Sequence, residues 1–251
     1  MKIVYHKAFE RVYADDPAAE AGRMECILNE LMGLYEFAEP QPAGIEDLLR
    51  VHTRKHIEFV KQYPLLYEVA CLSAGGAILA AELAIRGEVS FALIRPPGHH
   101  AGPDSCWGFC YFNNIAISVK KLLDEKKIEK ALIVDFDLHY GDGTASIFKD
   151  LSEVTYYHLP GGSSRVKQLE NLEAFLKKAG SYDILCVSAG FDRGKEDLGG
   201  ILEIEDYRVI GQLLKEASRK TCGGRRFAVL EGGYSHRVLG KNVKSFLEGF
   251  G

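Results

Sequence analysis

The sequence predicts an α/β protein whose mostly parallel central sheet is covered by helices on both faces. Short apolar runs of strand length alternate with amphipathic segments along the chain, which is the pattern of parallel β-α-β units. Clusters of Gly, His and Asp directly follow four of these runs, where the loops of an open parallel sheet build binding sites. Since no linker, repeat or change in composition interrupts residues 1–251, we expect a single domain.

In the first half of the chain, short apolar runs predict strands and longer periodic segments predict helices. Helix 18–37 places Met24 and Leu31 on one face. Thr53 is positioned to cap the next helix, and Gly87 to end the Ala-rich helix that follows. The elements are expected at 2–6, 18–37, 48–51, 53–60, 65–86, 90–94 and 112–124.

The second half of the chain repeats this alternation. The continuous apolar runs at 131–136 and 183–188 indicate strands that are buried on both faces. The elements are expected at 131–136, 143–148, 154–158, 168–178, 183–188, 205–219, 227–230 and 243–250.

Composition restricts the partners of the chain. A net charge of −4 without a long basic run argues against direct binding to nucleic acid. Six cysteines without a C-x-x-C pair, and no signal peptide, predict a cytoplasmic protein with reduced thiols. The uncharged stretch between Glu68 and Glu82 is too short to span a bilayer, so we expect no membrane partner. Composition is compatible with a homo-oligomer.

The strongest functional signal is the segment A-L-I-V-D-F-D-L-H-Y-G-D-G-T, from Ala131 to Thr144. If the strand continues, its period of two puts Asp135, Asp137 and His139 on one side. Carboxylates and an imidazole at the carboxyl end of a buried strand are typical of an enzyme site in an open sheet. A capped strand end followed by a solvated turn is the plain alternative.

A further carboxylate follows a later strand. Asp192 lies in S-A-G-F-D, and on its own it would more often cap a turn or a helix. Together with Asp137 and His139 it completes a site of two carboxylates and one imidazole, with an open position for water, as catalytic zinc requires. The same donors would also accept Fe²⁺ or Co²⁺.

Two other loops supply groups for acid–base chemistry. The loop R-P-P-G-H-H carries His99 and His100, and spare carboxylates could each fix one ring nitrogen of a histidine. Tyr234 in L-E-G-G-Y could donate a hydrogen bond to a developing oxyanion. Taken singly, each loop could equally carry solvated histidines or a packing tyrosine.

These segments together resemble the histone deacetylase superfamily, in particular its class II-like lysine deacetylases and acetylpolyamine amidohydrolases. G-H-H, G-F-C-Y-F-N-N, D-F-D-L-H-Y-G-D-G-T, S-A-G-F-D and L-E-G-G-Y occur in the family's order between Ile94 and Leu247. The resemblance implies an arginase/deacetylase-like fold. It also implies a zinc-dependent amidohydrolase that removes an acetyl or other short acyl group from acetyl-lysine, an acetylpolyamine or a small acetylated amine. A non-catalytic protein that kept the pocket, and a binuclear manganese ureohydrolase of the same fold, are the alternatives.

The resemblance also implies roles for individual residues. It makes Asp137, His139 and Asp192 the zinc ligands. It pairs His99 with Asp135 and His100 with Asp142, makes His100 the general base, and assigns Tyr234 to the transition state. Gly108 and Phe109 would line the acyl-lysine tunnel, and Arg23 would lie below the site. A structural potassium ion would be held, mostly by backbone carbonyls, at Asp135, Asp137, His139, His158 and Leu159.

Three departures from the family pattern bear on the substrate. Tyr140 stands where a second histidine is usual, and the segment 160–164 lacks the second tunnel aromatic. At the rim, where relatives carry a larger side chain, the resemblance places Gly199. We therefore predict a wide, shallow mouth that favours small acylated amines over histone-like peptides.

His52 and His56 have the i, i+4 spacing that can bind a metal on a helix. Because no third ligand is in view, we predict that these two histidines are solvated or act as caps.

Overall fold

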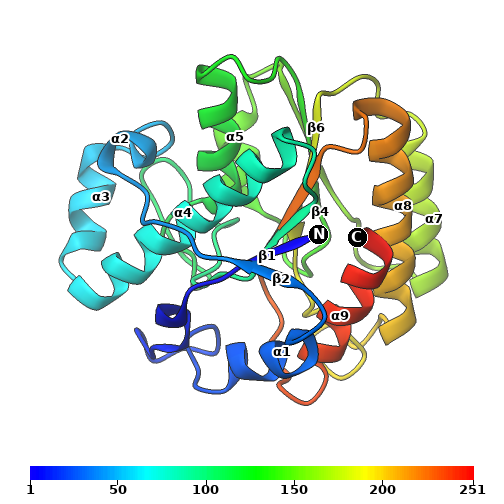
Figure 1. Ribbon diagram of the computed structural model, residues 1–251, viewed down its shortest axis with the longest axis horizontal. Helices are drawn as coiled ribbons and strands as arrows, with labels where there is room; N and C mark the ends of the chain where they lie inside the picture. The colour runs from blue at the N-terminus through cyan, green and yellow to red at the C-terminus, as the bar shows by residue number, and fades with distance from the viewer.

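The computed structural model describes all residues 1–251 and contains a seven-stranded sheet (Figure 1). The strands are β1 (Lys2–Val4), β2 (Glu36–Ala38), β3 (Ser90–Ala92), β4 (Ala131–Asp135), β5 (Val154–His158), β6 (Ile184–Ala189) and β7 (Arg226–Leu230). Their order is β2-β1-β3-β7-β6-β4-β5, and every neighbouring pair is parallel. The predicted α/β fold class is confirmed, and the sheet is parallel throughout.

Helices cover both faces of the sheet. They are η1 (a 3₁₀ turn, Lys7–Glu10), α1 (Arg23–Leu31), α2 (Ile45–Leu48), α3 (Arg54–Lys61), α4 (Pro64–Ile85), α5 (Asn114–Asp124), α6 (Asp142–Phe148), α7 (Arg165–Leu176), α8 (Ile204–Cys222) and α9 (Leu239–Phe250). Figure 1 shows α3, α4 and α5 on one side of the sheet and α7, α8 and α9 on the other. Both faces of the sheet are therefore covered, as the long apolar runs in the sequence require.

The four central strands, β3, β7, β6 and β4, are consecutive in the sheet and buried along their whole length. Their register aligns their carboxyl ends, since Asp135 pairs with Ser188 and Ala189 pairs with Leu230. Because parallel strands all end on the same edge, the four polar loops that follow these strands are brought together there. The strand order thus places the candidate site.

The helix predicted at 18–37 is shorter in the structure. It spans only Arg23–Leu31, because Gly22 before it and Gly33 after it adopt left-handed φ angles of 89° and 79°, and the chain then forms the edge strand β2. Met24 and Leu31 are buried as predicted. The strand predicted at 48–51 is wrong, because this segment contains the end of α2 and the turn after it.

Helix α4 is long and apolar enough, by length and composition, to cross a membrane. Its apolar window is nevertheless 78% buried against the rest of the fold, as in the core helix of a compact domain. The uncharged stretch between Glu68 and Glu82 is only part of α4, which extends beyond it at both ends. Its contacts with β3, β7 and the neighbouring helix α5 agree with a core role.

His52 and His56 are buried, so the alternative that made them solvated is wrong. The Nδ1 atom of His52 donates to the Gly102 carbonyl at 2.9 Å, and its Nε2 accepts from the Asn113 backbone N–H at 2.9 Å. The neutral ring thus ties the turn before α3 to the loop that carries the histidine pair and to the N-terminus of α5. Burial, and then the nearby His56, lower the pKa of His52 to about 3.

We expect His52 to make the protein less stable in mild acid. An unfolded histidine titrates near pH 6.5, whereas the pKa of folded His52 is about 3. Its contribution to stability is therefore complete above pH 6.5 and is lost as the pH falls toward 3. Between pH 6.5 and 5 the loss is about 2 kcal/mol. Urea unfolding of the wild type and His52→Gln at the two pH values measures it. An equal fall in both proteins would contradict the assignment.

Candidate active site

Two carboxylates and one imidazole meet at the ends of neighbouring strands. Asp137 and His139 follow β4, and Asp192 follows β6. The Nδ1 atom of His139 lies 3.0 Å from Asp192 Oδ2 and 3.3 Å from Asp137 Oδ1. One ligand atom from each residue falls within 4.8 Å of the others. Both carboxylates are buried, and the His139 side chain is 46% exposed, so the cluster is open on the side of the imidazole.

Backbone N–H groups hold the two carboxylates in place. Asp137 Oδ2 accepts from the Gly232 N–H at 2.8 Å, and Asp192 Oδ1 accepts from the Leu138 N–H at 2.9 Å. The other oxygen of Asp192, Oδ2, is buried and accepts no hydrogen bond of good geometry, although His139 Nδ1 lies 3.0 Å away. Burial and the negative charge of Asp137 raise the pKa of Asp192 to about 6. A divalent cation would satisfy both the free oxygen and the excess negative charge, so these three residues fit a metal ion.

A pair of histidines, each bound to a carboxylate, lies beside this cluster. His99 Nδ1 is 3.0 Å from Asp135 Oδ2, and His100 Nδ1 is 2.6 Å from Asp142 Oδ1. The loop twists so that both rings face the site, with their centroids 4.1 Å apart. The partner carboxylate fixes which nitrogen of each ring carries a proton and leaves the opposite nitrogen for chemistry.

The environments of the two histidines shift their pKa values in opposite directions. Burial, and then the charge of His99, lower the pKa of His100 despite its bond to Asp142. Burial also acts against the charged form of His99, but the charges of Asp137 and Asp135 outweigh it and raise the pKa of His99 well above its usual value. Opposite shifts in neighbouring groups are a mark of separate acid and base roles.

Sequence reasoning missed the role of Trp107. Its ring lies on His100 with the centroids 3.9 Å apart, and its Nε1 donates to Asp142 Oδ2 at 3.0 Å. Asp142 therefore binds the histidine and the tryptophan at once. A lone tryptophan within a polar Gly/Pro loop was the available signal. Tyr156 was missed as well, although its hydroxyl donates to Asp135 Oδ2 at 2.9 Å.

Glu231 was also missed, although it lies within the segment L-E-G-G-Y. Its carboxylate is fully buried and accepts from the Gly98 N–H at 2.7 Å and from the Ser188 hydroxyl at 3.1 Å. Burial raises the pKa of Glu231 to about 7. Arg23, on α1, donates to the carbonyls of Glu231 and Gly233. These bonds fix the turn that precedes Tyr234.

A cavity of about 230 Å³ opens onto these groups. Gly108 has a left-handed φ of 57°, and a Cβ there would lie 2.5 Å from the His100 ring, so only glycine fits. The ring of Phe109 meets that of Tyr234 edge-on at 5.9 Å. The cavity is lined by Pro97, His99, His100, Trp107, Gly108, Phe109, His139, Leu198, Gly232 and Tyr234.

The structure corrects the prediction for Gly199. Leu198, not Gly199, lines the cavity, and its side chain is 66% exposed at the mouth. A Cβ on Gly199 would lie 2.7 Å from the Cα of Arg193. Gly199 is therefore required by the close approach of two backbone segments, and it does not widen the mouth. The prediction that Gly199 makes the mouth wide is therefore wrong.

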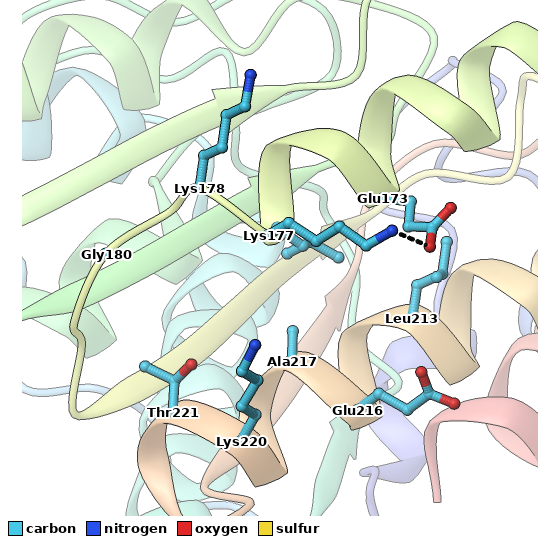
Figure 2. A pocket seen from close by; sticks show the side chains of 10 residues that line it. Glu173, Lys177, Lys178, Gly180, Leu213, Glu216, Ala217, Lys220 and Thr221 are labelled. Atoms are coloured by element: carbon cyan, nitrogen blue, oxygen red, sulfur yellow. Dashed lines mark hydrogen bonds and ion pairs between the residues drawn. The ribbon is translucent and has the colours of Figure 1, made fainter.

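A second, more open hollow of about 500 Å³ lies between α7 and α8 (Figure 2). Figure 2 shows Lys177 paired with Glu173, at 2.6 Å, while Lys178 and Lys220 extend separately. Its lining contains no histidine and no buried carboxylate. It lacks the convergent groups of the first cavity, so the first cavity is the candidate active site.

A parallel α/β sheet with convergent carboxylates and histidines at the ends of its central strands is the arrangement of an enzyme active site. A family model described as histone deacetylase domain matches residues 18–164 and 158–250. The chain therefore belongs to the histone deacetylase family, and it is a hydrolase acting on amides.

Individual relatives agree with this assignment. The chain is 31% identical to a probable deacetylase of Methanothermobacter thermautotrophicus, over 99% of this chain and 90% of the relative. It is 30% identical to a histone deacetylase-like amidohydrolase of Pseudomonas aeruginosa, over 90% and 74% of the two chains. A crystal structure of the HDA15 HD domain has the same fold, with a TM-score of 0.86 at 24% identity over 98% of this chain and 88% of that chain.

We expect the purified protein to hold about one zinc ion per chain, because three protein ligands suit a catalytic zinc site. Asp192→Ala should lose most of this metal, whereas Asp142→Ala should keep it, because Asp142 binds His100 and lies outside the cluster. Elemental analysis after dialysis measures the content of both variants. Full retention of metal by Asp192→Ala would show that the third ligand is another residue.

Proposed function

We propose that this protein is a zinc-dependent deacetylase that hydrolyses the amide of an acetylated primary amine. The observation that carries the proposal is the meeting of the Asp137–His139–Asp192 cluster with the His99–His100 pair and Tyr234 in one cavity. The six cysteines, all free thiols, support work in the reducing cytoplasm.

The donor atoms of the cluster suit zinc, and Fe²⁺ would be accepted by the same ligand types. When bound, such an ion supplies a polarised substrate carbonyl and an acidified water. The chain itself provides the orientation of the substrate and the movement of protons. Asp197 Oδ2 accepts from the Tyr234 N–H at 2.7 Å and so fixes the start of the loop from which the phenol reaches the cavity.

His100 serves as the general base. Its lowered pKa keeps the ring neutral near pH 7, and its bond to Asp142 leaves Nε2 free to accept a proton from the attacking water. His99, whose pKa is raised, carries the proton that the leaving amine requires. The phenol of Tyr234 donates a hydrogen bond to the tetrahedral oxyanion.

We expect His100→Ala to lower kcat by about 10²–10⁴-fold, which is the usual effect of removing a general base. Zinc content should stay unchanged, because His100 lies outside the metal cluster. Hydrolysis of an acetyl-lysine peptide, with zinc measured on the same samples, tests both points. Unchanged turnover in His100→Ala would show that another group is the general base, whereas no turnover by the wild type would favour a protein that binds acylated amines without hydrolysing them. Parallel loss of zinc and activity would make His100 a ligand.

Apolar side chains surround the mouth of the cavity. Trp107 is 54% exposed and Leu198 is 66% exposed, while Phe109 lines the cavity further in. Such a mouth favours the burial of an aliphatic chain, whether it belongs to lysine or to a small amine. We propose an acetylated amine on an unbranched aliphatic chain as the substrate class.

We expect Leu198→Ala to raise KM for an acetylated alkylamine by up to about tenfold while kcat changes little, because the side chain buries methylenes and lies away from the reacting amide. The matched control is Val166→Ala, since Val166 is an exposed apolar residue on α7 outside the cavity. Steady-state kinetics of both variants measure the effect. An unchanged KM for Leu198→Ala would place the aliphatic chain elsewhere.

A further inference from the structure

A fully buried arginine lies behind the metal cluster. Arg193 directly follows Asp192 on the chain, and its side chain has no exposed surface. Its Nε donates to the carbonyls of Phe136, at 2.9 Å, and Asp137, at 3.0 Å. Its Nη2 donates to the carbonyl of Leu159.

Two further side chains complete the environment of this guanidinium. Nη1 donates to Gln168 Oε1 at 3.0 Å, and Gln168 is itself fully buried on α7. His158 Nε2 lies 3.4 Å from Arg193 Nη2 and 3.0 Å from the Asp137 carbonyl. A buried charge requires this degree of hydrogen bonding, and the planar, multidentate guanidinium provides it.

The carbonyls that bind Arg193 are among those expected to hold a structural potassium ion. The resemblance assigned this ion to Asp137 and Leu159, among other residues, and both carbonyls now accept hydrogen bonds from the guanidinium. The Asp135 carboxylate is also occupied, by the Asp137 N–H, His99 and Tyr156. Potassium therefore does not fit this site, because these carbonyls already bind the guanidinium of Arg193 and the ion would have to displace it.

We propose that Arg193 is a built-in monovalent cation that replaces potassium and positions the Asp137 backbone and the metal cluster. It carries the same single charge as potassium, and the chain supplies it permanently. Folding and metal binding are therefore independent of potassium in solution. This role does not depend on the substrate or on the hydrolysis of an amide.

The first experiment uses the zinc-loaded wild type in potassium chloride and in tetramethylammonium chloride at equal ionic strength. We expect the same thermal unfolding midpoint and the same zinc content in both media. An ion that binds only the folded state would raise the midpoint. A higher midpoint in potassium chloride would therefore overturn the proposal, and this readout requires no substrate.

The second experiment restores a cation to Arg193→Ala. We expect a lower unfolding midpoint and a metal affinity reduced by about 10–100-fold, as when residues that support metal ligands are removed. Potassium or methylguanidinium should restore part of both, and tetramethylammonium should restore neither. If the variant folds only in potassium chloride, its refolding yield in potassium chloride and in tetramethylammonium chloride replaces the unfolding midpoint as the measurement. No recovery with either small cation would overturn the proposal.

Arg226→Ala is the matched control. Arg226 is also a buried arginine, and it donates to the carbonyls of Phe250 and Gly224, far along the chain from the metal cluster. Its removal should lower the unfolding midpoint without any recovery by potassium and without loss of metal affinity. Rescue of Arg226→Ala by potassium would show that the effect at Arg193 is not specific.

Discussion

Two buried carboxylates that face each other impose the central constraint on this structure. Asp137 and Asp192 lie at the ends of adjacent strands, where burial and mutual repulsion both act against their charged forms. Positive charge must compensate them from the cavity side and from the interior. On the open side, either a protonated His139 or a bound metal ion can supply it, and Arg193 supplies it from within.

The same constraint explains why the loops around the site are so rigidly bound. Backbone N–H groups of one loop donate hydrogen bonds to the carboxylates of another. Gly232, after β7, donates to Asp137, after β4, and Leu138 donates to Asp192, after β6. These hydrogen bonds hold the carboxylates of Asp137 and Asp192 in place without a bound ion, which lowers the reorganisation required when a metal ion binds. The cost of burying charge is thus offset by a site that is already formed.

Many of the strands and helices could be predicted from local sequence patterns, because a strand that is buried on both faces has a continuous apolar sequence. The strand at Ala131 was predicted in this way, and the cap at Thr53 was predicted from the preference of threonine for the N-cap position; both are present. Strand order could not be predicted, because it depends on contacts between segments far apart in sequence. For the same reason, the stacking of Trp107 on His100 and the hydrogen bonds of Arg193 to distant carbonyls were missed. Gly199 was misplaced because its close backbone contact leaves no sign in the sequence.

The chain contains a single tryptophan, and that residue is part of the candidate site. Trp107 is half-exposed at the mouth, its ring touches His100, and its indole N–H is bound to Asp142. All tryptophan emission of this protein therefore arises from one indole beside the proposed general base. With excitation at wavelengths that tyrosine does not absorb, intrinsic fluorescence is an optical reporter of this cavity alone and needs no label.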